Sequence, residues 1–130
     1  MDSMKKYRLA VDENGSPFVL NSKGSIDFGY ITEEMNLPPA PIRIAEGNAG
    51  PKGYGLKHII EGHEKEIINS GYASVYDFIE DVASGFTEIK EGRAGSFLLE
   101  KGDAYHNTLF ISLSKEWDYW KVISGGVFRI

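Results

Sequence analysis

The sequence contains no cysteine among its 130 residues. This absence excludes disulfide bonds, thiolate nucleophiles, cysteine-based zinc sites and iron–sulfur clusters. Long hydrophobic runs are also missing: no stretch reaches the ~18 apolar residues of a membrane span, and no charged-then-apolar leader opens the chain. These absences predict a soluble, cytoplasmic protein that has no membrane partner.

A surplus of positive charge is missing as well. The chain has 14 Lys and Arg against 19 Asp and Glu, a formal net charge of −5. Proteins that bind nucleic acid through general phosphate attraction are basic overall. Any contact with nucleic acid is therefore expected to come from a local cluster of cations.

Composition and length predict an ordinary globular protein with one domain over residues 1–130, since 42% of the residues are hydrophobic and 25% are charged. No P-loop motif is present in the sequence. The Gly-Tyr-Gly run at 53–55 lacks the third glycine of a dinucleotide-binding fingerprint. We therefore expect no cofactor.

The first 50 residues predict a hairpin followed by extended chain. Apolar runs at 7–11 and 17–20 flank a turn that contains Asn14 and Gly15, which readily adopt the positive φ values of tight hairpins. Prolines between positions 38 and 41 exclude a helix and lead into an extended segment at 42–44.

Residues 51–85 predict a pair of helices. Apolar positions follow helical spacing over 56–69 and again over 74–84. Ser74 has the side chain of an N-cap, with Asp77 three residues on, and Gly85 is typical of a helix end. Most of the excess negative charge falls in this helical region, which has six acids against three bases.

After residue 85 the hydrophobic period changes to two, which indicates strands, and the short connections favour hairpins. The sequence therefore predicts an α+β fold, in which two helices pack on one face of a four- to five-stranded antiparallel meander. The expected strands are residues 86–90, 96–100, 108–113, 119–124 and 127–130.

His58 is the leading candidate for chemistry. It is expected one turn into the first helix, where free backbone amides, the helix N-terminus and Lys57 favour an anion such as phosphate. His63 lies five positions on, roughly 140° around the helix, so we expect the two histidines on different faces and no metal between them. The alternative is that His58 is a half-buried packing residue and Lys57 a solvated one.

The predicted sheet adds candidates that also have ordinary structural explanations. Lys90 fits a solvent-exposed charge pair, and Trp120 fits core packing. Arg93 lies in a turn, His106 before a strand, and Ser124 near the end of the sheet. RNA cleavage without a metal needs a base for the 2′-hydroxyl proton, cations or amides for the phosphorane, and an acid for the leaving 5′-oxygen. Side chains of these types suffice for that reaction.

Four segments together carry a resemblance to one family. The most specific is Gly-Tyr-Gly-Leu-Lys-His-Ile at 53–59, and the others are residues 18–29, 37–43 and 120–124. In these segments and in the order of its elements, the chain resembles the phage-associated barnase/EndoU/colicin/RelE-like (BECR) nuclease domains. Such domains occur in polyvalent proteins of phages and conjugative elements. The similarity covers roughly residue 18 to the C-terminus.

The resemblance implies a helix pair and a four-stranded antiparallel sheet whose concave face holds the site of a metal-independent, toxin-like endoribonuclease. It places His58 as general base or acid, with Ser124 as an orienting hydrogen-bond partner. Lys57 and Arg93 are implied to hold the phosphate. The expected partners are RNA, such as a tRNA loop, and an immunity protein. The residues expected to contact the substrate are Lys90, His106, Tyr54 and Trp120.

Two other functions fit the same residues. A non-catalytic module of a phage or conjugative-element protein would grip RNA or protein with the same concave sheet. A small phosphoester-handling enzyme would instead use the loop at 53–55. Cleavage of tRNA in EDTA is expected of a nuclease but not of the binding module. The phosphoester enzyme is instead expected to turn over a small phosphoester, and EDTA or a competing nucleotide should abolish that turnover.

Overall fold

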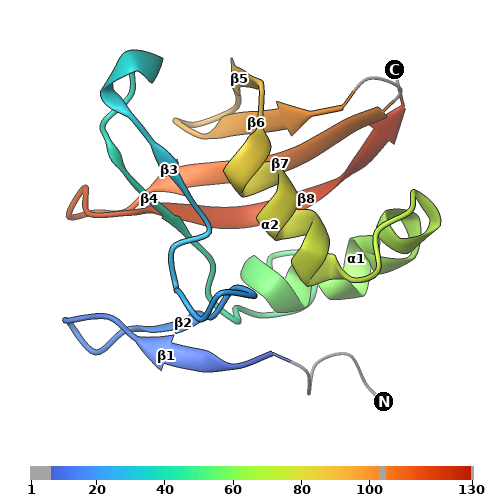
Figure 1. Cartoon of the computed structure of the whole chain (residues 1–130), viewed down its shortest axis with the longest axis horizontal. Coiled ribbons are helices and arrows are strands. Elements are labelled where there is room, and N and C mark those ends of the chain that lie inside the picture. Colours follow the sequence, from blue (N-terminus) through green and yellow to red (C-terminus); the bar gives the residue numbers. More distant parts are fainter. Residues whose placement is uncertain (1–6, 103–104, 130) are drawn as a thin grey trace.

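The computed structural model describes residues 7–102 and 105–129 (Figure 1). Over these residues the fold is α+β, as predicted, with two α-helices, a short 3₁₀ helix and eight strands in two sheets. Neither α-helix has the length and apolar character needed to cross a membrane within the described ranges. The elements are β1 (Leu9–Val11), β2 (Pro17–Val19), β3 (Gly29–Ile31), the 3₁₀ helix η2 (Glu33–Met35), β4 (Ala40–Arg43), α1 (Gly55–Asn69), α2 (Val75–Gly85), β5 (Glu88–Glu91), β6 (Phe97–Lys101), β7 (Tyr105–Leu113) and β8 (Trp120–Arg129).

Strands β1 and β2 form the predicted hairpin as a separate two-stranded antiparallel sheet. Asp12 organises the turn, because its Oδ1 accepts hydrogen bonds from the backbone N–H groups of Asn14 and Ser16, both at 2.9 Å. Gly15 has a φ of 83°, a left-handed conformation that glycine adopts without strain. The hairpin therefore follows from local sequence.

The main sheet has six strands in the order β3-β4-β8-β7-β6-β5, so the predicted extent of four to five strands is wrong. β5 to β8 do form an antiparallel meander, and the segment expected as a fifth strand at 127–130 continues β8 to Arg129, with residue 130 outside the described residues. β3 and β4 complete the sheet at the opposite edge, and β4 runs parallel to β8 with Ile42 opposite Trp120. A parallel pair joins segments far apart in the chain, so no local turn signal announces it.

Helix α2 packs across one face of the main sheet (Figure 1). Its side chains Phe78, Ile79 and Val82 are fully buried and belong to one hydrophobic cluster with Leu99 and Leu109 of the sheet. Burying each such side chain stabilises the fold by about 1.5–3 kcal/mol. This face of the sheet is therefore covered by the hydrophobic core.

The N-terminus of α2 is capped as predicted, because Ser74 Oγ accepts a hydrogen bond from the backbone N–H of Asp77 at 3.2 Å. Ser74→Ala is therefore expected to lower the free energy of unfolding by about 1 kcal/mol. The control is Ser84→Ala near the other end of the helix, where an exposed hydroxyl donates only to the Glu80 carbonyl. Urea denaturation of both variants checks the prediction, and equal losses would contradict it.

Helix α1 lies beside β8 along much of the strand (Figure 1). Near one end, Lys121 Nζ lies 5.9 Å from the ring centroid of Tyr54, the N-cap residue of α1. Towards the other end, Glu66 Oε2 accepts a hydrogen bond from the Val127 N–H at 2.9 Å. Since β4 pairs with β8 only at Trp120 and Lys121 in the described structure, α1 occupies the side of β8 that β4 leaves free.

Candidate functional site

The two faces of β7 and β8 differ in what covers them. A Cβ at Gly125 would lie 2.8 Å from Leu109 Cδ2 and 3.3 Å from Phe78 Cε2, so Gly125 and Leu109 face the core. Their neighbours Gly126 and Thr108, which are paired in the sheet, therefore face the other way. We call this second surface the outer face. It carries His106, Thr108, Phe110, Ser124 and Gly126.

Helix α1 reaches the outer face at Gly126, where two of its side chains approach the strand. A Cβ on Gly126 would lie 2.9 Å from His63 Nδ1 and 2.8 Å from Glu66 Oε2. His63 Nδ1 is also 3.2 Å from Glu66 Oε1, an ion-pair distance without hydrogen-bond alignment, and this nitrogen is shielded from solvent. Because Glu66 also accepts the Val127 N–H, it connects His63 to β8.

His58 lies next to His63. Their ring centroids are 6.4 Å apart with the rings nearly edge to face, so the two side chains meet although they leave the helix in different directions. The 140° angle describes where the side chains leave the helix, whereas the rings lie farther out and turn about two torsions. His58 Nδ1 lies 3.2 Å from the carbonyl oxygen of Gly50, which fixes the ring against the glycine-rich loop.

A second polar cluster on the outer face is centred on Glu100, whose side chain is only 10% exposed. Its Oε1 accepts hydrogen bonds from Lys90 Nζ at 3.0 Å and His106 Nδ1 at 3.1 Å. Burial alone raises the pKa of Glu100, but the two hydrogen bonds outweigh burial and hold that pKa below its ordinary value of 4.5. The hydrogen bond to Glu100 also raises the pKa of Lys90.

The lowered pKa of Glu100 predicts a contribution to acid stability. In the pH range just below 4.5 the unfolded chain binds a proton at Glu100 more readily than the folded chain does. This contribution is complete above pH 4.5 and is lost as the pH falls through the lower folded pKa. Glu100→Gln is therefore expected to flatten the loss of stability between about pH 5 and 3.

Urea denaturation across this pH range measures the effect. The control is Glu88→Gln, because Glu88 lies on the neighbouring strand opposite Glu100 but is exposed. The same pH dependence in wild type and Glu100→Gln would contradict the assignment.

Two of the three histidines, His58 and His63, lie together where α1 meets the sheet, and His106 lies on the outer face of β7. His63 contacts Gly126 and lies 6.4 Å from His58. His106 is two residues from Thr108, the partner of Gly126, which corresponds to about 7 Å along the strand. The outer face and the adjoining part of α1 therefore carry imidazoles, the Lys90 amine and the carboxylates of Glu66 and Glu100.

Other predicted residues lie at varying distances from this surface. Ser124 is on the outer face, half-buried and opposite Phe110. Arg93 is exposed in the β5–β6 turn, on strands separated from β8 by β7, so the structure does not bring it to His58. Trp120 is 1% exposed and its Nε1 donates to the Pro38 carbonyl at 2.9 Å, so it offers no ring face to a ligand.

The start of α1 differs from expectation. Its amides were expected to be free for an anion, yet the N–H groups of Leu56 and Lys57 donate to the carbonyls of Ala45 and Glu46 at 3.0 and 2.8 Å. These amides are therefore used by the preceding loop. The half-buried Lys57 is a cation adjacent to His58 in the sequence, and Tyr54 lies at the helix start with 37% of its surface exposed.

Sequence reasoning missed His63, Glu66 and Glu100 as site residues. His63 and Glu66 have the i,i+3 spacing of side chains that meet on a helix surface, which was a usable signal. A glycine inside a strand, such as Gly126, often marks a close approach by another group. Glu100 gave no local signal, because its partners come from neighbouring strands.

In comparisons with protein-family models, with curated proteins and with solved structures, nothing matched this chain. Among the described residues, no group of three or more histidine, aspartate or glutamate side chains is placed to hold a metal ion.

Proposed function

We propose that this chain is a metal-independent endoribonuclease and that RNA is cleaved where α1 meets the outer face. The observation that carries the proposal is the close approach of His58 and His63, whose ring centroids are 6.4 Å apart, with His63 placed against Gly126 of β8. Acid–base cleavage needs two groups that transfer protons, and imidazole is the side chain whose ordinary pKa lies near neutrality. The resemblance to BECR nucleases points to the same reaction.

The partners of the two α1 histidines favour different roles. The Gly50 carbonyl can only accept a hydrogen bond, so His58 carries its proton on Nδ1 and has its lone pair on Nε2, as a base requires. His63 Nδ1 faces the Glu66 carboxylate, which favours a proton there and balances the charge when Nε2 is protonated as well. We assign His58 as general base and His63 as general acid.

The reaction then follows in one sequence. His58 Nε2 removes the 2′-hydroxyl proton, the 2′-oxygen bonds to phosphorus, and the bond from phosphorus to the 5′-oxygen breaks. His63 Nε2 donates a proton to that 5′-oxygen, which leaves a 2′,3′-cyclic phosphate and a 5′-hydroxyl. Lys57 stabilises the negative charge of the phosphorane, and Ser124 orients the phosphodiester by hydrogen bonding.

The resemblance also supplies the biological class in this proposal. We infer a toxin-like nuclease of a phage or conjugative element, held in check by an immunity protein. A net charge of −5 does not favour binding to RNA in general. It fits a narrow substrate such as a tRNA loop, recognised by local contacts.

The direct test is incubation of the purified protein with total tRNA in EDTA, followed by gel electrophoresis. Wild type is expected to produce discrete fragments, and His58→Ala is expected to leave the tRNA intact. The matched control is Lys65→Ala, an exposed residue of the same helix, which should cleave as wild type does. Intact tRNA at high wild-type concentration would reject the nuclease and favour the binding module.

A pair of adjacent glycines separates effects on the site from effects on the core. In Gly126→Ala the new Cβ would lie 2.9 Å from His63 Nδ1, so the imidazole has to move. Misplacing a catalytic group by about 1 Å can lower a rate by about 10²-fold, which we expect for cleavage by this variant. Gly125→Ala instead presses on Leu109 and is expected to lower the free energy of unfolding by about 1–3 kcal/mol.

Single-turnover cleavage rates and urea denaturation of both glycine variants measure the two effects. The account expects the larger rate loss in Gly126→Ala and the larger stability loss in Gly125→Ala. A larger rate loss in Gly125→Ala than in Gly126→Ala would show that the position of His63 against β8 does not matter for cleavage.

A further inference from the structure

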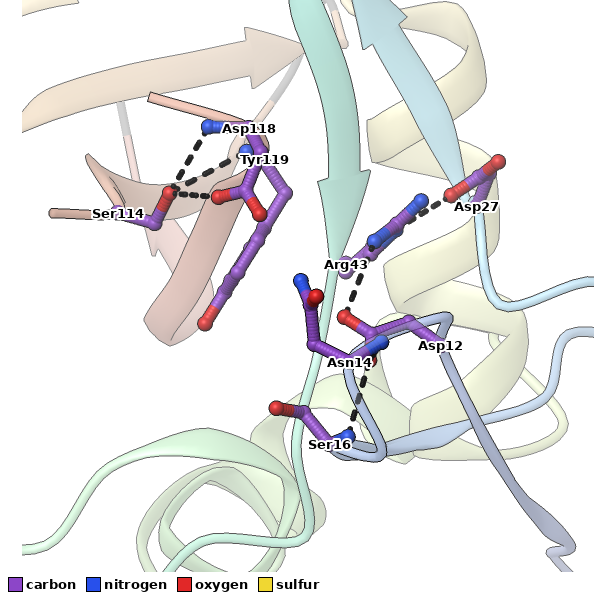
Figure 2. Close-up of polar contacts among 8 residues, drawn as sticks. All are labelled: Asp12, Asn14, Ser16, Asp27, Arg43, Ser114, Asp118 and Tyr119. Carbon is purple, nitrogen blue, oxygen red and sulfur yellow. Dashed lines mark hydrogen bonds and ion pairs between the residues drawn. The ribbon is translucent and has the colours of Figure 1, made fainter. Parts of the chain in front are cut away.

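A groove separate from the histidine cluster runs between the β1–β2 hairpin and the turn that joins β7 to β8. It consists of two clefts of about 400 and 680 Å³. Both clefts are lined by Ser16, Tyr119 and Lys121, so they are continuous, and we call them together the hairpin groove. Figure 2 shows Asn14 and Ser16 from the hairpin turn facing Ser114, Asp118 and Tyr119 from the other turn.

Most carboxylates of the hairpin groove are already engaged within the protein. The acid–donor pairs are Asp12 with Arg43 at 3.7 Å, Asp118 with Ser114 at 2.6 Å, and Glu46 with Tyr7. Arg43 also pairs with Asp27 (Figure 2), so it anchors the hairpin turn to the sheet and is not available to a ligand. Glu116 is left at the exposed rim.

Apart from Glu116 at the rim, the groups that remain available are aromatic, cationic and hydroxyl-bearing. Lys121 has no carboxylate within ion-pair distance in the described part of the chain, and its amine lies 5.9 Å from the centroid of the exposed Tyr54 ring. The Tyr119 ring is held in place by Phe18, whose centroid is 5.0 Å away. Aromatic faces next to a lysine are the features by which proteins bind single-stranded nucleic acid.

We propose that the hairpin groove binds single-stranded RNA next to the phosphodiester that is cleaved, with a base stacked on Tyr54 and the adjoining phosphate on Lys121. The proposal rests on the proposed nuclease function. Lys121 and Gly126 are five residues apart on β8, about 16 Å of strand, so one extended RNA strand would follow β8 from the groove to the histidines.

Binding of an RNA that cannot be cleaved tests the groove independently of catalysis. The probe is a fluorescently labelled, fully 2′-O-methylated oligonucleotide of mixed sequence, titrated with wild type and variants in an anisotropy assay. Lys121→Gln is expected to weaken binding by about three- to tenfold and to reduce the salt slope by about one. Tyr54→Leu keeps an apolar side chain but removes the aromatic face, and should weaken binding by roughly five- to a hundredfold.

Two controls make the result specific. Lys23→Gln removes an exposed lysine outside the groove and should change the dissociation constant less than twofold. Lys121→Arg retains the charge and should bind nearly as wild type does. Equal weakening by Lys23→Gln and Lys121→Gln would overturn the groove proposal, as would wild-type binding that neither groove variant changes.

Failure of the groove and failure of the nuclease proposal are distinguishable. Cleavage of tRNA without any Lys121-dependent binding would reject the groove but leave the nuclease intact. Lys121-dependent binding without cleavage would support the groove and reject the nuclease. A wild-type protein that binds no RNA at all would reject the groove as an RNA site and favour a protein partner there.

Discussion

His63→Ala is expected to lower the rate of RNA cleavage by about 10²- to 10⁴-fold, the usual contribution of a general acid. The imidazole is held between Glu66 and Gly126, where its Nδ1 is shielded from solvent and only Nε2 is left for proton transfer. His58 is fixed to the Gly50 carbonyl and is not expected to replace His63 at the same place. Single-turnover cleavage of tRNA at neutral pH measures the loss.

Folding of the His63 variant has to be checked alongside its rate. His63 is partly exposed, at 27% of its side chain, so we expect an unchanged circular dichroism spectrum and a small change in stability. Glu66→Gln removes the charge that faces His63 and should lower the rate of cleavage more than the affinity for RNA. A His63→Ala protein that is folded and cleaves at the wild-type rate would remove His63 from the mechanism.

Trp120→Ala is expected to lower the free energy of unfolding by about 3–5 kcal/mol. The indole is 1% exposed, packs edge-on against Phe97 with centroids 5.7 Å apart, and donates to the Pro38 carbonyl. Its removal leaves a large cavity where β4 joins β8 and leaves that carbonyl without its partner. Guanidinium denaturation of the purified variant measures the effect.

Trp117→Ala is the matched control, since Trp117 lies in the β7–β8 turn and is 66% exposed. We expect a change within about 0.5 kcal/mol for this variant. If Trp120→Ala were as stable as wild type but bound RNA poorly, Trp120 would be a ligand-binding residue, as expected from the sequence. Because the indole is buried, we expect a loss of stability and no direct effect on RNA binding.

Locally encoded elements were predicted well from the sequence. The β1–β2 hairpin followed from Asn14-Gly15, and α2 followed from an apolar stripe with Ser74 as its cap. The sheet was predicted only in part, because β4 pairs with a strand almost eighty residues away through contacts such as Ile42 with Trp120. Hydrophobic periodicity identifies a strand but does not identify a distant partner.

The candidate site shows the same division between local and distant information. His58 was proposed as a candidate because its surroundings are read from adjacent residues, and Lys90 and His106 do lie on one surface. Their link through Glu100 depends on cross-strand register, which the sequence does not reveal. Arg93 was grouped with them by residue type alone, and the order of the strands separates it from α1.

The central claim is that α1 and the outer face of β8 form a site for 2′-hydroxyl attack on RNA. The most direct test uses a DNA copy of the tRNA segment that the protein cuts, with one ribonucleotide at the cleaved position, incubated with the wild-type protein in EDTA and analysed by mass spectrometry. The account predicts one cut, directly after the ribonucleotide, that yields a 2′,3′-cyclic phosphate and a 5′-hydroxyl. Equal cutting of the same oligonucleotide with a 2′-O-methyl group, or no cutting of either substrate or of tRNA, would contradict it.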